Sequence, residues 1–288
     1  MSKIAIISDT DASLPAEIAA KHNIQLVPIT IHFGDETFLT DEDINDEQLF
    51  DRVDRDGVLP TTSAPSPGAF SEAYDAAFAA GAESVICLNV SAEISATYAA
   101  AVAARDLHPQ RDIIVIDSRS LSMAQGFTVL AAAEAAESGA SKEQVIAAAT
   151  QVRDRAYMYA ALSTLKYLAM SGRVGHLAAG MANLFNVKPI LTIQNGKLEL
   201  LERVRTQRKA AARVIELLSE CTGGRRIERL AIIHVRALED ALRFKEQLCA
   251  EVGCPDEIIV TELTPGLSVH SGAGLVGACC VVEAEVPA

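Results

Sequence analysis

The sequence lacks an excess of basic residues. Its 25 lysines and arginines are outnumbered by 38 aspartates and glutamates, which gives a formal net charge of -13 at pH 7. A chain with this charge has no overall field that attracts phosphate backbones or anionic lipid surfaces. We therefore expect no nucleic-acid partner.

Long apolar runs are also missing. The alanine-rich stretches are interrupted by Glu134, Glu137 and Lys142, so none supplies the roughly 20 apolar residues that a membrane-spanning helix needs. The amino terminus passes directly into a short apolar strand and Asp9, without the longer apolar region and cleavage site of an export signal. These features predict a cytoplasmic protein with no membrane span.

The motifs of several common chemistries are absent. The sequence contains no phosphate-binding GxxxxGK[ST] loop, no GxSxG nucleophile elbow, no HExxH pair and no CxxC. We therefore expect no cofactor, no metal and no catalytic residue of a standard kind. Several cysteines lie in apolar runs, as small hydrophobic residues do, and all six are expected to be core thiols in a reducing compartment: Cys87, Cys221, Cys249, Cys254, Cys279 and Cys280.

Alternating strand and helix patterns indicate an α/β protein. With 288 residues and 50% apolar content, the chain can bury a substantial core in two domains. The expected strands cover residues 4–8, 24–31, 84–89, 113–117, 229–235 and 257–261, and the expected helices cover residues 69–80, 94–106, 121–137, 142–155 and 207–220. This alternation favours parallel sheets flanked by helices.

The second half of the chain has a different pattern. Residues 190–200 form two strand-like runs around Asn195-Gly196, which is the strongest short-range signal for a hairpin. Antiparallel pairing is therefore expected there beside parallel pairing. We predict a doubly wound parallel-sheet domain over residues 1–160 and an α+β domain over residues 161–288.

Hydroxyl-rich loops follow several predicted strands. They cover residues 8–13, 91–97 and 117–120, and a further hydroxyl-rich loop over residues 61–68 follows a charged segment; each of the four enters a helix. Each loop alone is explained by Ser and Thr caps, but parallel strands bring their carboxyl ends to one edge of a sheet, where ligands bind. Helix amino termini favour negative charge, so a carboxylate or phosphate is the expected ligand group. Asp9 and Asp11 are expected to have structural roles.

Three further features carry candidate residues. His270 lies in a predicted glycine-rich turn over residues 265–274, where it could bind an anion or move a proton, and Arg173 lies in a polar turn, where it could bind a carboxylate. A basic cluster stands out against the acidic chain and is either a solvated face or a docking patch for an acidic partner; it comprises Arg203, Arg205, Arg208, Lys209, Arg213, Arg225, Arg226 and Arg229.

Together these motifs resemble the DegV family. Residues 7–15 look like its opening strand and turn, residues 62–68 like its Thr-Ser-x-Pro-Ser loop, and residues 115–118 like its third motif; the likeness continues at residues 171–173, 186–191, 196 and 203–206. Two motifs depart from the family: Ser-Gly-Thr-Tyr is Ser95-Ala96-Thr97-Tyr98 here, and His-x-Gly-Pro-Gly is His270-Ser271-Gly272-Ala273-Gly274. Alanine can replace glycine at position 96 only if φ is negative, and it leaves the Ser95 hydroxyl in place.

The resemblance implies a protein that binds a long-chain fatty acid, such as palmitate, in an apolar tunnel between two domains. It implies that Thr62 or Ser63, together with Ser95, holds the carboxylate, with His270 and Arg173 nearby. In some bacteria such proteins are the acyl-carrying subunit of a fatty acid kinase, so Arg203, Arg205 and Arg208 are candidates for docking that kinase.

Two other functions stay open at the level of sequence. In an ester or thioester hydrolase, Ser95 would be the nucleophile and His270 its base, although no orienting acid is identifiable. A regulatory protein that uses the arginine cluster is compatible with lipid binding.

Overall fold

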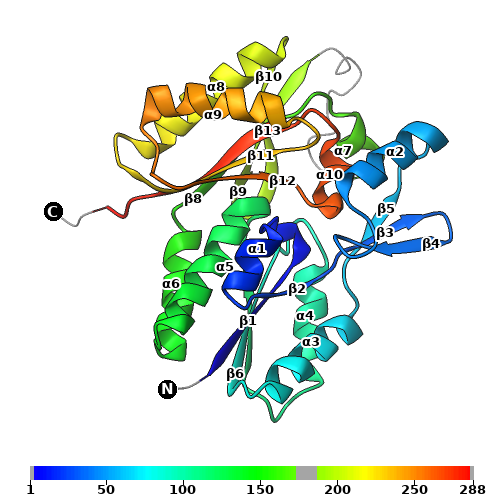
Figure 1. Ribbon diagram of the computed structural model, residues 1–288, viewed down its shortest axis with the longest axis vertical. Helices are drawn as coiled ribbons and strands as arrows, with labels where there is room; N and C mark the ends of the chain where they lie inside the picture. Colours follow the sequence, from blue (N-terminus) through cyan, green and yellow to red (C-terminus); the bar gives the residue numbers. More distant parts are fainter. Residues whose placement is uncertain (1–2, 173–186, 286–288) are drawn as a thin grey trace.

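Two β-sheets and the helices packed on them form the body of the protein (Figure 1). The structure is a computed structural model that describes residues 3–172 and 187–285. It confirms the α/β class. No helix in the described part of the chain is long and apolar enough to cross a membrane.

The first sheet is parallel and has the strand order β2-β1-β6-β7. Its strands are β1 (Ile4–Asp9), β2 (Gln25–Val27), β6 (Ser84–Asn89) and β7 (Ile113–Asp117). Successive side chains of a strand point to opposite faces. Accordingly, Ile7 packs on the side of α3 (Pro67–Ala79) and α4 (Thr97–Asp106), whereas Ile6 packs on the side of α5 (Ser122–Glu137).

The second sheet is mixed and has the order β10-β9-β8-β13-β11-β12. Its strands are β8 (Ala156–Ala161), β9 (Lys188–Gln194), β10 (Lys197–Val204), β11 (Ile227–His234), β12 (Ile258–Glu262) and β13 (Val276–Val282). Only β11 and β12 pair in parallel among these described strands, so the predicted mixture of pairing is confirmed. On this sheet Ile232 faces α8 (Gln207–Thr222) and α9 (Leu238–Val252), and Ile233 faces α5.

Helix α5 lies between the two sheets and contacts both (Figure 1). Every residue from 122 to 133 is buried, which is the behaviour of a helix that is apolar all round. Alanines let the sheets approach it closely, and α6 (Lys142–Arg153) packs along its side. The largest core therefore combines Ile6 of one sheet with Ile233 of the other. The predicted domain boundary at residue 160 falls in β8 and stays a prediction.

A small antiparallel sheet brings distant segments together. It has the order β4-β3-β5 and consists of β3 (Thr30–Phe33), β4 (Glu36–Leu39) and β5 (Thr61–Ser63). Helix α10 (Pro265–Ser271) packs against β3, β5 and α2 (Asp46–Asp56). The remaining elements are η1 (Thr10–Ala12), α1 (Ala16–Lys21) and α7 (Lys166–Met170).

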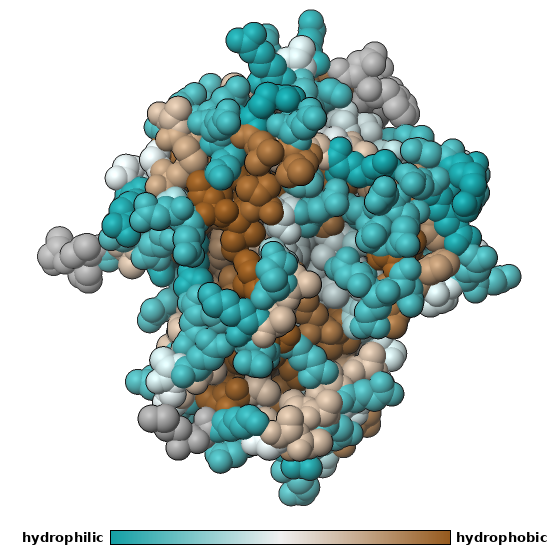
Figure 2. All heavy atoms as spheres, viewed as in Figure 1, coloured by the Kyte–Doolittle hydropathy of each residue, from teal (hydrophilic) through white to brown (hydrophobic). Residues whose placement is uncertain are grey.

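Polar and apolar residues separate on the face shown in Figure 2. Polar residues cover α2, while apolar residues gather over β12 and the adjoining part of α9. Strand β12 is an edge strand with half-buried Ile258 and Val260, and the exposed Leu238 and Leu242 lie on α9. The second sheet thus leaves part of its edge uncovered in the described structure.

Several predicted segments differ from the structure. The single strand expected over residues 24–31 breaks at Pro28, which has no N–H to donate, and its two parts join different sheets as β2 and β3. The turn expected over residues 265–274 begins as helix α10. The loop expected over residues 61–68 begins as strand β5, although Ser66 caps α3 by accepting a hydrogen bond from the Ala69 amide.

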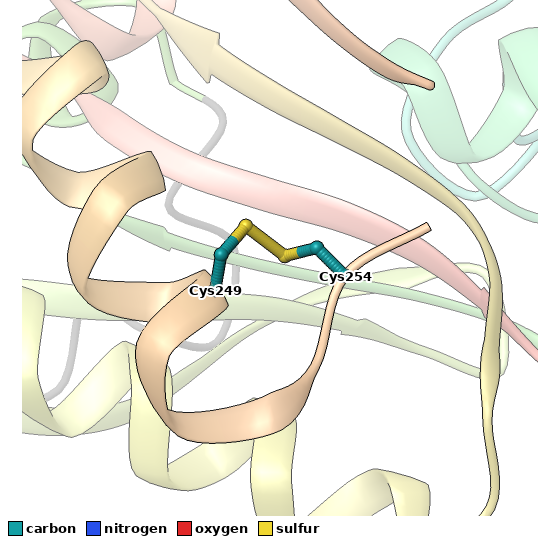
Figure 3. Close-up of a disulfide and its surroundings, with 2 residues drawn as sticks. All are labelled: Cys249 and Cys254. Atoms are coloured by element: carbon teal, nitrogen blue, oxygen red, sulfur yellow. A yellow bond between two sulfur atoms is a disulfide. The ribbon is translucent and has the colours of Figure 1, made fainter. Parts of the chain in front are cut away.

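The cysteine prediction is wrong for two of the six residues. Cys249 and Cys254 form a disulfide, drawn in Figure 3. Cys249 lies in the last turn of α9, and Gly253, with φ of +66°, turns the chain so that the two Cα atoms are 5.1 Å apart. Among the described residues, Cys87, Cys279 and Cys280 are buried thiols and Cys221 is a half-buried one.

Asp9 joins three elements at the carboxyl edge of the parallel sheet. Its fully buried carboxylate accepts hydrogen bonds from the Val90 amide at 2.8 Å, the Asp11 amide at 3.0 Å, and the Asn89 and Gln125 side chains at 3.2 Å each. Burial raises the pKa of Asp9, and these four bonds oppose the rise. The expected structural role of Asp9 agrees with this arrangement.

We predict that Asp9→Ala lowers the free energy of unfolding by about 2–4 kcal/mol, because it leaves buried N–H groups without an acceptor. Asp112→Ala is the control, since its ion pair with Lys142 is exposed and solvent screens the attraction, so its loss of stability should be much smaller. Urea denaturation followed by circular dichroism measures both changes. Equally small decreases in the free energy of unfolding of the two variants would contradict the structural role of Asp9.

Candidate functional site in an apolar cavity

A cavity of about 580 Å³ lies between the inner face of the mixed sheet and the loops that follow β6 and β7 of the parallel sheet. This volume is within the range of about 300–1,000 Å³ that small-molecule sites occupy. Its lining contains eight leucines drawn from both halves of the chain: Leu121, Leu162, Leu168, Leu191, Leu198, Leu263, Leu267 and Leu275. Flexible aliphatic walls of this kind suit an unbranched apolar chain.

Polar groups also line the cavity, and we call them together its polar wall. Its lining includes His270 and Ser271 from α10, Glu93 from the loop between β6 and α4, and Lys197 from the start of β10. An apolar space with a few polar groups favours a ligand that is mostly hydrocarbon and carries a polar end.

Thr62 and His270 meet beside this cavity although 208 residues separate them in the chain. Thr62 Oγ1 and His270 Nε2 are 3.0 Å apart, and both residues are half-buried. Strand β5 presents Thr62 to the last turn of α10, which carries His270. The structure thus brings together two residues that the sequence proposed for the same site.

Ser63 bonds to a different partner. Its hydroxyl is 2.9 Å from Nε2 of His32, and Nδ1 of His32 is 3.1 Å from the Thr37 hydroxyl. Neighbouring residues of a strand point to opposite sides, so Thr62 and Ser63 do not share one face of β5. Of the two, Thr62 is the residue in contact with His270, and Ser63 stays a predicted ligand.

Ser95 lies in the turn that enters α4. Its hydroxyl is 2.8 Å from that of Thr97 and accepts a hydrogen bond from the Thr97 amide at 3.3 Å. Helix α4 therefore begins at Thr97, later than expected. The φ of Ala96 is -75°, the negative value that a replacement of glycine requires. Glu93 and Ile94, just before Ser95, line the cavity.

The predicted arginines differ in where they lie and in which residues they contact. Arg173 lies outside the described residues. The exposed arginines Arg203, Arg205 and Arg208 lie at the end of β10, in the turn that follows it and at the start of α8, respectively. Other members of the predicted basic cluster form ion pairs with glutamates of the same chain: Arg213 with Glu202, Glu216 and Glu220, and Arg229 with Glu134. The cluster is therefore not one continuous solvated face.

The hydrolase hypothesis pairs Ser95 with His270, whereas hydrogen bonds among the described residues join each of them to another hydroxyl. The hydroxyl of Ser95 is bonded to Thr97, and Nε2 of His270 is bonded to Thr62. Among the residues that the structure describes, no group of three or more His, Cys, Asp or Glu side chains is placed to hold a metal ion.

Sequence reasoning missed Lys197, Glu93 and Asp46. The Asn195-Gly196 signal located the hairpin that carries Lys197, but only the tertiary fold shows that this hairpin reaches the loop containing Glu93. Asp46 belongs to an acid-rich stretch over residues 41–56 that is typical of a solvated helix, and yet it is buried at the start of α2.

Asp46 supports α10 from the side opposite His270. The Ser268 hydroxyl donates to Asp46 Oδ2 at 2.6 Å, and Asp46 is only 3% exposed. Burial raises the pKa of Asp46 to about 8; the nearby carboxylates of Glu262 and Asp41 add to the rise, and Ser268 and Arg236 oppose it. The carboxyl group of Asp46 is therefore mostly protonated in the folded protein at neutral pH.

We predict that Asp46 lowers stability as pH rises from about 4 to about 8. Across this window the unfolded carboxyl, with its ordinary pKa of 3.8, is ionised while the folded one still holds its proton. The free energy of unfolding then falls by up to about 1.4 kcal/mol per pH unit. Asp46→Asn should flatten this slope, whereas Glu47→Gln, an exposed neighbour on α2, should not. Denaturant titrations at several pH values measure the slopes, and equal slopes in both variants would contradict the assignment.

Comparison with known proteins places these features in a family. A family model described as an uncharacterised protein of the DegV family matches residues 3–283. Protein DegV of Bacillus subtilis is 30% identical over 277 residues, which cover 96% of this chain and 98% of that protein. A DegV domain-containing protein of Streptomyces coelicolor is 34% identical over 274 residues, covering 95% of this chain and 96% of its own.

Solved structures agree with this match. A DegV family protein from Thermus thermophilus, described by its fatty acid binding, has a TM-score of 0.90 and 29% identity, covering 98% of this chain and 100% of that one. Bacillus subtilis DegV, described as a fatty acid binding protein, has a TM-score of 0.88, 29% identity and the same coverage. With the family model spanning nearly the whole chain and the fold shared throughout, the protein belongs to the DegV family.

Proposed function

We propose that this protein binds a long-chain fatty acid, with the acyl chain in the leucine-lined cavity and the carboxylate at its polar wall. The observation that carries the proposal is the junction of this apolar cavity with the Thr62–His270 pair. The two solved DegV structures described as fatty acid binding support it.

The acyl chain and the head group contribute very different amounts to the binding free energy. About 15 buried methylenes at about 0.8 kcal/mol each contribute on the order of 12 kcal/mol before costs. One charge-assisted hydrogen bond adds about 1.5–3 kcal/mol, and immobilisation of the ligand subtracts several. The acyl chain thus supplies most of the affinity, and the head-group contacts fix its direction.

The proposed carboxylate ligands are Thr62, Ser63, Ser95, His270 and Arg173. Hydroxyls donate to a carboxylate without a permanent countercharge, so they hold it in place and leave it reactive. Such a site suits presentation of the carboxylate to a fatty acid kinase that forms an acyl phosphate. In this proposal the protein is a lipid-binding subunit rather than an enzyme, and it needs no cofactor.

The proposed location is the cytoplasm. The buried thiols of Cys87, Cys279 and Cys280 suit a reducing compartment, whereas the Cys249–Cys254 disulfide is a bond that such a compartment tends to reduce.

Organic extraction of the purified, folded protein followed by mass spectrometry tests the main proposal. We expect one long-chain fatty acid per chain, or saturable binding of added palmitate after the lipid has been removed. Absence of both results would overturn the proposal. Ester hydrolysis that disappears in Ser95→Ala would instead establish the hydrolase.

We predict that Thr62→Val and Ser95→Ala each weaken palmitate binding by about tenfold or more, because each removes one donor worth about 1.5–3 kcal/mol. Thr61→Val is the matched control for Thr62, since Thr61 is its exposed neighbour on β5. Titration of lipid-free protein gives the affinities, and thermal unfolding verifies that each variant is folded. Equal affinities for Thr61→Val and Thr62→Val would remove Thr62 from the site.

We predict that Arg205→Glu and Arg208→Glu slow acyl phosphate formation by a DegV-dependent fatty acid kinase without changing the bound lipid. The exposed arginines would meet an acidic surface on the kinase, so charge reversal acts mainly on association. Arg153→Glu on α6 is a charge-matched control. Kinase turnover measured at several concentrations of the lipid-loaded variants gives the effect, and unchanged turnover assigns these arginines to the solvated surface.

A further inference from the structure

Two opposite charges face each other in the lining of the apolar cavity. Lys197 Nζ lies 3.6 Å from Glu93 Oε2, and the two side chains are 54% and 53% exposed. Glu93 belongs to the loop that continues to Ser95, and Lys197 opens strand β10. A negative charge in this wall opposes an incoming carboxylate, whereas a positive charge attracts it.

The backbone that carries Lys197 is held against this loop. The Ser91 hydroxyl donates to the Gly196 carbonyl at 2.7 Å, and Arg119 donates to the Asn195 side chain at 3.4 Å. Gly196 has φ of +81°, and a Cβ there would lie 2.8 Å from the Ser91 oxygen. The hairpin turn is therefore closely fitted to the loop, which places Lys197 beside the cavity.

The Glu93–Lys197 pair is weak enough to exchange. Half-exposed ion pairs contribute at most about 1 kcal/mol, because water screens the attraction and ordering two long side chains costs entropy. A lysine is a flexible point charge that can turn from one carboxylate to another. Pairing with a ligand carboxylate in place of Glu93 thus costs little.

We propose that Lys197 is a specificity-determining residue for the head group: its ammonium leaves Glu93 and pairs with the carboxylate of the bound fatty acid. The proposal rests on the proposed fatty-acid binding and adds a residue to it. Lys197 distinguishes an acid from an uncharged alcohol of the same chain length, and Glu93 competes with the ligand for Lys197.

The test compares hexadecanoate with hexadecan-1-ol on lipid-free full-length protein, by displacement of a fluorescent fatty acid. Lys197→Gln should lower the affinity for hexadecanoate about fivefold and leave the affinity for hexadecanol unchanged. Glu93→Gln should raise the affinity for hexadecanoate by a smaller factor. Lys21→Gln, an exposed lysine on α1, is the control for total charge.

The double variant shows whether Lys197 contacts the ligand carboxylate or only neutralises the charge of Glu93. If Lys197 contacts the carboxylate, Glu93→Gln/Lys197→Gln binds hexadecanoate more weakly than Glu93→Gln alone. If Lys197 only neutralises Glu93, the two bind equally and the proposal is overturned. Equal losses for acid and alcohol, or no loss in Lys197→Gln, also overturn it. A parent protein that binds neither compound would instead refute fatty-acid binding itself.

Discussion

Burial of α5 against both sheets is the constraint on which the site depends. The helix covers only part of the inner face of the mixed sheet, and Met158, Ala160, Leu191 and Ile233 on the same face remain to line the cavity. The small residues of α5 set how closely the sheets approach. Because parallel strands end at one edge, the loops that follow β6 and β7 reach the rim of this cavity together.

Helix α10 is held from several sides, and this support orients His270. Thr62 contacts His270, while the buried carboxyl of Asp46 accepts from Ser268. After the helix, Gly272 has φ of +77°, and a Cβ there would lie 2.2 Å from the ring of Tyr167. A side chain fixed by packing and hydrogen bonds loses little entropy on binding, so His270 is preorganised at the polar wall.

Local patterns predicted much of the fold. Strands β6 and β7 match the expected residues, and the Asn195-Gly196 turn joins β9 and β10 as expected. Strand β13 was missed because Val276-Gly277-Ala278-Cys279 has little strand character; its small residues are explained by the sheet itself, where a Cβ on Gly277 would lie 2.5 Å from the Tyr159 carbonyl. The need for a small residue at this position comes from the neighbouring strand, so it produces no recognisable pattern in the local sequence.

The motifs predicted which residues belong to the site better than they predicted how those residues are arranged. The motifs named Thr62, Ser95 and His270, but whether Thr62 or Ser63 faces His270 depends on the register of β5 with β3. The role proposed for Lys197 depends on a contact between a hairpin and a loop about 100 residues away in the chain. Registers and contacts of this kind arise from packing between elements, which a single sequence does not display.

Burial and charge are distributed unevenly around the cavity, and this division suits a carrier. Leucines surround the space that the acyl chain would fill, so chain length and shape depend on packing there. Apart from the buried Ser271, the polar groups of the lining are half-buried or exposed, so they remain within reach of a second protein. A fully buried ion pair would hold a carboxylate more tightly and keep it from a partner, because separating buried charges is costly. In the proposed complex, hydroxyls, a histidine and an exchangeable lysine would orient the head group while leaving it accessible for transfer.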